Sequence, residues 1–133
     1  MRYLGIDYGT KRVGLSISDE DGKIAFPYSV LSCDANLLSN IMDICQKEAV
    51  GAIVIGESKD FKGNDNFIMN DVRKLAKALE TKVGISVFLE PEFLTSRQAA
   101  QIQGAHSKLD ASSAAIILQS YLDKQTYRKS QMN

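Results

Sequence analysis

The sequence predicts an α/β fold, in which a mixed five-stranded sheet carries helices on both faces. Apolar residues alternate with small or polar ones at 13–18, and from Leu37 onward they recur at helical spacing between short apolar runs. The predicted element order is βββαβαβα. Three strands joined by hairpins, followed by strands reached through helices, produce a sheet with antiparallel and parallel parts.

The first three elements are predicted to be antiparallel strands. Residues 2–7 form the first strand and residues 13–18 the second, which places apolar side chains on one of its faces. The residues DEDG at 19–22 supply turn chemistry for a hairpin. The third strand spans residues 23–31, where Pro27 indicates a bulge or an edge position.

The remaining elements alternate between helix and strand. Apolar residues at helical spacing predict one helix from Leu37 to Cys45 and another from Ile68 to Leu79 that ends before Gly84. Buried strands are predicted at 52–56 and 85–90, and a last helix carries an apolar stripe from Ala114 to Leu122. A short helix is expected at 95–103.

Length and composition limit the possible classes of protein. With 133 residues, of which 44% are hydrophobic, the chain fits one domain over residues 1–125, followed by a frayed tail at 126–133. The 16 basic and 16 acidic residues cancel, so a nucleic-acid partner must be argued from a local site. Two widely spaced cysteines and the lack of a long apolar run predict a soluble, cytoplasmic protein.

Acidic residues follow the strands that are predicted to be parallel. Asp7 ends the first strand, Glu57 follows the fourth, Glu90 and Glu92 follow the fifth, and Asp110 begins the last helix on its sheet-facing side. Ligands of open α/β sheets bind beyond the carboxyl ends of such strands. Convergent carboxylates repel one another unless a cation compensates, which indicates a divalent metal. Singly, these acids also fit ordinary roles as a turn residue, a helix N-cap and solvated loop acids, and for Glu57 and Glu90 the solvated role is favoured.

Three motifs carry a resemblance to a known family. The segments GIDYGTKRVGLSISD, LTSRQAA and LDASSAAIILQSYLD resemble the YqgF family of RuvC-like nucleases, and the resemblance extends over nearly the whole chain. It implies an RNase H-like fold. The family is described as Holliday-junction resolvases and as pre-16S ribosomal RNA processing nucleases, so processing of the 5′ end of pre-16S rRNA in ribosome biogenesis is the expected function.

The family's three acids map onto Asp7, Glu92 and Asp110 of this chain. Around Glu92 the motif departs from the family pattern, because Pro91 replaces an aspartate and Phe93 replaces an arginine. The loop after the fourth strand also departs and reads GESKDFKG. Glu57 therefore competes with Glu92, or joins it, as the middle metal ligand.

The chemistry implied is phosphodiester hydrolysis by an endo- or exonuclease. Two Mg²⁺ ions about 4 Å apart would be held by carboxylates, with Asp7 bridging them and Mn²⁺ able to substitute. The lone His106 fits an ordinary loop residue better than a leaving-group acid, and it argues against a zinc site. The residues expected to contact nucleic acid are Thr10, Lys11 and Arg12, with Arg97 and Lys108 as weaker candidates.

Alternative functions follow from the same residues. A resolvase of branched DNA would use the same acids, whereas a non-catalytic RNA-binding or ribosome-assembly module would explain the altered residues around Glu92. The segment GIDYGT also resembles a phosphate loop of actin-like ATPases, but those proteins need two such domains, and this chain is too short for both. We expect a monomer or homodimer that binds structured RNA or branched DNA and no membrane.

Overall fold

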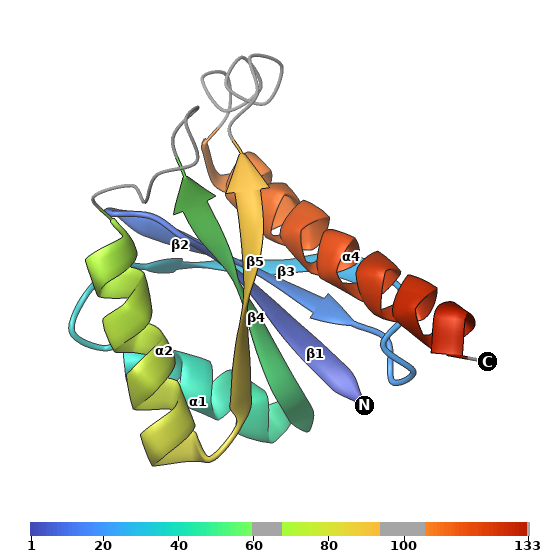
Figure 1. The fold of residues 1–133 in the computed structure, drawn as a ribbon. Coiled ribbons are helices and arrows are strands. Elements are labelled where there is room, and N and C mark those ends of the chain that lie inside the picture. The colour runs from blue at the N-terminus through green and yellow to red at the C-terminus, as the bar shows by residue number, and fades with distance from the viewer. Residues whose placement is uncertain (60–67, 94–105, 133) are drawn as a thin grey trace.

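The computed structural model describes residues 1–59, 68–93 and 106–132. Five strands form one sheet in the order β3-β2-β1-β4-β5 (Figure 1). Neighbouring strands are antiparallel from β3 to β1 and parallel from β1 to β5, which confirms the predicted mixed sheet. The strands are β1 (Arg2–Tyr8), β2 (Arg12–Ser18), β3 (Ala25–Ser32), β4 (Val50–Lys59) and β5 (Ser86–Phe93).

Helices cover both faces of the sheet, as predicted. On one face lie α1 (Leu37–Lys47) and α2 (Met69–Val83), and on the other lies the long helix α4 (His106–Met132) (Figure 1). Of the helices in these described ranges, none combines the length and the apolar character that crossing a membrane requires.

Strand alternation divides the apolar residues between two cores. The fully buried Leu4, Ile6, Ile53 and Ile55 pack with α1 and α2, whereas Val54 packs with Leu118 and its neighbours on α4. Strand β4 is therefore apolar on both faces, which explains why its sequence contains a continuous apolar run.

Several boundaries differ from the sequence prediction. Strand β4 is longer than the predicted 52–56, and β5 continues through Pro91 to Phe93 instead of ending at Glu90. Proline is tolerated there because β5 is the last strand of the sheet. Helix α4 begins at His106, so Asp110 lies in its second turn and the N-cap interpretation of Asp110 is wrong.

Two other local predictions hold. The β2–β3 register shifts between Leu15 and Ser16, opposite the region of Pro27, which confirms the bulge. Helix α2 ends at Val83, and the Gly84 that caps it has a left-handed φ of 74° and donates its N–H to the Glu80 carbonyl. Residues 126–132, predicted to fray, belong to helix α4. The short helix expected at 95–103 lies outside the described residues.

Candidate functional site

The parallel strands end at one edge of the sheet, where helix α4 begins. Figure 1 shows the arrowheads of β4 and β5 and the first turns of α4 at the same end of the molecule. This edge is where open α/β sheets bind their ligands. The five acids singled out from the sequence all belong to these strands or to the start of α4.

Asp7 lies near the carboxyl end of β1, on the sheet face covered by α4. Two residues earlier, a Cβ added to Gly5 would meet Ser16 Oγ, Leu118 Cβ at 2.8 Å and the Ala114 carbonyl oxygen at 3.0 Å. Because Gly5 faces α4, strand alternation puts Asp7 on the same face. The residue is half-buried.

Helix α4 runs antiparallel to β1, and this brings the backbone of Asp110 to the level of Asp7. The buried Ser16 hydroxyl donates to the Ala114 carbonyl at 2.7 Å, which fixes α4 against the sheet beside Gly5. Asp110 precedes Ala114 by one helical turn, about 6 Å along the axis. Asp7 follows Gly5 by two strand residues, about 6.6 Å in the same direction.

Strand register places Glu92 on the same edge. Ile6 pairs with Ile55, so the next position along β1 and β4 sets Asp7 beside Gly56. Gly56 pairs in turn with Glu90 of β5, and Ser58 pairs with Glu92. The backbone of Glu92 therefore lies one strand repeat beyond the row formed by Asp7, Gly56 and Glu90, toward the carboxyl edge.

Glu57 belongs to the opposite face of the sheet. It continues the alternation of Ile53 and Ile55, which pack against α1 and α2, and it is half-buried. The sequence left open whether Glu57 or Glu92 is the middle acid, and the strand alternation separates Glu57 from the face that carries Asp7.

Glu90 was expected to be a solvated loop acid, and this expectation is wrong. Its side chain is 3% exposed, and Lys124 of α4 donates to both carboxylate oxygens, at 2.7 and 3.0 Å. Burial of a carboxylate requires such a partner. In the sequence, Phe88 and Glu90 are two residues apart, so they share one face of a strand. This spacing indicates that Glu90 packs against the protein only once β5 is known to continue to Phe93.

The turn between β1 and β2 flanks Asp7 with positive charge. Thr10, Lys11 and Arg12 are exposed, and the Lys11 carbonyl accepts a hydrogen bond from the Cys33 amide at 2.9 Å. The backbone of Lys108 belongs to the first turn of α4 at this same edge. His106 was expected in a loop, but it is the first residue of this helix. Arg97 lies outside the described residues.

Tyr8 follows Asp7 but packs on the α1 and α2 side. The Cys33 thiol donates to the Tyr8 hydroxyl at 3.3 Å. This hydrogen bond, desolvation by burial and the nearby charges of Cys33 and Asp71 raise the pKa of Tyr8 to about 12. Tyr8 is therefore a neutral group at physiological pH, and it borders the site from the other face.

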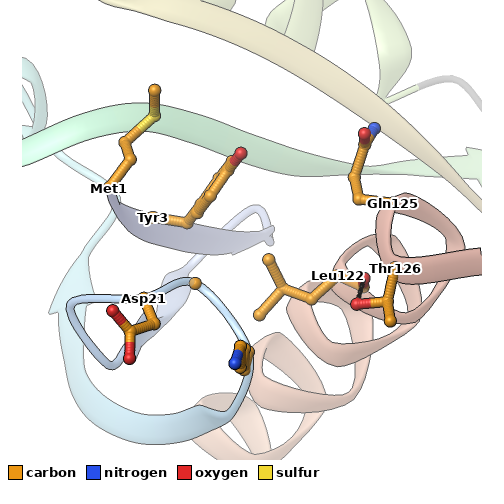
Figure 2. A pocket seen from close by; sticks show the side chains of 8 residues that line it. Met1, Tyr3, Asp21, Leu122, Gln125 and Thr126 are labelled. Atoms are coloured by element: carbon orange, nitrogen blue, oxygen red, sulfur yellow. Dashed lines mark hydrogen bonds between the residues drawn. The ribbon is translucent and has the colours of Figure 1, made fainter. Parts of the chain in front are cut away.

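A pocket of about 280 Å³ lies at the other end of β1 and is not part of this site. Figure 2 shows Met1 and Tyr3 across from Leu122, Gln125 and Thr126 of α4. The lining residues come from the amino end of β1, the β2–β3 turn and the carboxyl half of α4. Asp7 and Asp110 lie toward the opposite ends of this strand and this helix.

Comparison with known proteins agrees with this architecture. The family model described as RuvX: Holliday junction resolvase matches residues 1–124. The chain is 38% identical over 132 residues to the "Putative pre-16S rRNA nuclease" of Maridesulfovibrio salexigens, covering 92% of this chain and 98% of that protein. A protein of the same name from Lawsonia intracellularis is 33% identical over 134 residues, covering 93% of this chain and 94% of that protein.

Solved structures share the fold at low sequence identity. Thermus thermophilus RuvC in complex with a Holliday junction substrate superposes with a TM-score of 0.61 at 14% identity, covering 95% of this chain and 96% of RuvC. The fowlpox virus Holliday junction resolvase superposes with a TM-score of 0.56 at 12% identity, covering 93% and 99%. The fold is thus RNase H-like, as the motifs implied. Because the family model extends over nearly the whole chain and the relatives align along nearly their full lengths, the chain belongs to the RuvX (YqgF) family.

Proposed function

We propose that this protein is a metal-dependent nuclease that hydrolyses phosphodiester bonds in structured nucleic acid, with the 5′ end of pre-16S rRNA as its substrate. The observation that carries the proposal is the register that brings the backbones of Asp7, Glu92 and Asp110 to one edge of the sheet. The names of the relatives support the substrate. Cleavage within the strand and removal of nucleotides from an end are both compatible with this site.

The three acids fit a magnesium centre by their chemistry. Carboxylate oxygens are the ligands that Mg²⁺ prefers, with Mn²⁺ as a close substitute. Among the side chains that the structure describes, no group of three acidic, histidine or cysteine residues is arranged to hold a metal ion. The proposed centre consists of Asp7, Glu92 and Asp110. When bound, Mg²⁺ supplies the charge that activates water and offsets the negative charge of the reacting phosphate.

The remaining roles belong to residues of this chain. Asp7 holds the metal from the central strand, where its backbone is fixed by pairing with β2 and β4. The exposed turn at Thr10, Lys11 and Arg12 binds the phosphate backbone of the substrate through its amides and its two positive charges. Glu57, on the other sheet face, takes no part.

Cleavage assays with single-residue variants test this assignment. Purified protein should cleave a pre-16S rRNA fragment with Mg²⁺ or Mn²⁺ and stop when EDTA is added. Asp7→Asn, Glu92→Gln and Asp110→Asn should each lower the rate by at least about a hundredfold, equivalent to ~3 kcal/mol of transition-state stabilisation. Glu57→Gln is the matched control, because it changes an acid of β4 on the opposite face and should keep most of the activity. Activity that survives EDTA or Asp7→Asn would refute the metal-nuclease proposal.

A branched-DNA resolvase is the second candidate. The description of the matching family model favours it. The same assay with a four-way DNA junction in place of the RNA separates the two substrates. Faster cleavage of the junction than of the RNA, with the same dependence on Asp7, would assign the site to DNA resolution.

A further inference from the structure

Helix α4 leaves part of strand β5 uncovered, and an aromatic ring occupies this opening. The helix packs mainly on β1, β2 and β3 and contacts β5 much less. Phe88 of β5 remains 40% exposed although it faces α4. Its ring stacks on Tyr121 of α4, with centroids 5.4 Å apart and planes 24° apart. The ring of Tyr121 also contacts the ring of Tyr3, with centroids 5.9 Å apart. The Phe88 ring thus packs on Tyr121 while part of its surface meets solvent.

Two basic side chains follow Tyr121 along the same side of α4. Lys124 comes three residues after Tyr121, and Arg128 seven residues after, so helical periodicity sets all three on one stripe. Lys124 is 53% exposed while its partner Glu90 is buried, so the ammonium is the part of this ion pair that meets solvent. An ammonium has three hydrogens to donate, and Glu90 accepts two of them. We call Phe88, Tyr121, Lys124 and Arg128 the β5–α4 surface.

The β5–α4 surface is connected to the proposed site by the strand itself. Phe88 precedes Glu92 by four residues of β5, about 13 Å of extended backbone. A strand of nucleic acid that passes over the site can therefore reach Phe88 within a few nucleotides. Cations beside an aromatic face match the phosphates and bases of a single strand, because every base can stack on an aromatic ring. An apolar protein partner would instead require depletion of charge around the ring.

We propose that the β5–α4 surface binds a single-stranded segment of nucleic acid that flanks the cleaved bond. A base stacks on the exposed part of Phe88, while Lys124 and Arg128 contact the neighbouring phosphates. The link to cleavage rests on the proposed function, but the binding itself does not. Because stacking and phosphate contacts accept any base, the surface contributes affinity without reading sequence.

Binding of fluorescent single-stranded oligonucleotides to the full chain in EDTA tests the proposal without requiring cleavage. RNA and DNA probes of the same length distinguish the two kinds of strand. Phe88→Ala should weaken binding about 5- to 150-fold, the range for loss of one aromatic–base stack. Phe88→Leu keeps apolar packing on Tyr121 but removes the aromatic plane, so it should still weaken binding about fivefold or more. Phe88→Tyr keeps the aromatic plane and should bind as tightly as the wild type. Arg128→Gln should flatten the slope of log affinity against log salt by about one.

Phe26→Leu is the matched control. Phe26 is also an exposed phenylalanine, but it belongs to β3, the outermost strand on the side of the sheet opposite β5. The affinity of Phe26→Leu should equal that of the wild type. Equal affinities of Phe88→Leu and Phe26→Leu would overturn the proposal, as would a wild type that binds no single strand. A dimer that Phe88→Leu dissociates without changing oligonucleotide binding would instead make this surface an interface between copies. Loss of the proposed function would look different: cleavage would be absent while binding still depended on Phe88.

Discussion

Replacing Gly5 with alanine is expected to push helix α4 away from the sheet at the point where the two are closest. The added methyl group would clash with Ser16 Oγ and lie 2.8 Å from Leu118 Cβ and 3.0 Å from the Ala114 carbonyl oxygen. The Ser16 hydroxyl can rotate away, but it then loses its buried hydrogen bond to Ala114. The other two atoms belong to the helix framework, so α4 itself must shift.

The cost follows from these two effects. Overpacking of a tight core contributes about 1–3 kcal/mol of destabilisation. Leaving the buried Ser16 hydroxyl without its acceptor adds about 1–3 kcal/mol. The free energy of unfolding should therefore fall by about 2–6 kcal/mol, out of the ~5–15 kcal/mol of a typical domain. For a chain of this length, the melting temperature should drop by roughly 8–24 °C.

Thermal melts followed by circular dichroism measure this drop. Gly51→Ala is the matched control, because its added Cβ would meet the flexible side chain of Met1, which can move aside. The double variant Gly5→Ala/Ser16→Ala removes the hydroxyl from the clash and should be more stable than the sum of the two single changes predicts. The cleavage rate at a temperature where Gly5→Ala stays folded should also fall, because a shifted α4 moves Asp110 relative to Asp7.

A melting temperature of Gly5→Ala within about 2 °C of the wild type would refute this reasoning, since it implies a cost of less than ~1 kcal/mol. An equal drop for Gly51→Ala would also contradict it. The loss would then come from alanine in a strand, and the contact between β1 and α4 would not be responsible.

Other perturbations have equally specific outcomes. Lys124→Met leaves the buried Glu90 carboxylate without its partner. Urea denaturation should show that the free energy of unfolding falls by about 2–3 kcal/mol, less than for fully buried pairs because Lys124 is half exposed. Adding Glu90→Gln to this variant should restore most of the lost stability. Absorbance titration should find Tyr8 ionising near pH 12, and Cys33→Ala should move the pKa of Tyr8 back toward 10. Because the pKa of Tyr8 is raised in the folded state, the stability that neutral Tyr8 contributes is present below pH 10 and is lost as the pH rises from 10 through 12. Asp7→Asn removes one of three proposed like charges, so the melting temperature of this variant in EDTA should exceed that of the wild type. Excess Mg²⁺ should narrow this difference in melting temperature. If the variant melts well below the wild type in EDTA, Asp7 is a structural residue.

Much of the fold, and the candidates Asp7 and Asp110, could be predicted from local sequence patterns. Alternation and helical spacing depend on neighbouring residues alone, and they identified the three hairpin strands, the parallel set and the last helix. Asp7 was identifiable because it ends an apolar strand beside Gly5, and the motif around Asp110 marked the helix that packs on that strand. The end of β5 differs from the prediction because an edge strand can continue through Pro91. The end of β4 differs because its charged residues pair with this extension of β5.

Tertiary structure decided which acids share a face and which side chains are exposed. Whether Glu57 or Glu92 accompanies Asp7 depends on strand register between distant segments, and a shift of one residue would exchange the two faces. Glu90 reads as a polar loop residue until Lys124, 34 positions later, is brought against it. The stack of Phe88 on Tyr121 likewise joins an edge strand to a helix far along the chain. Contacts of this kind come from the packing of α4 across the sheet, which leaves no periodic signal in either segment alone.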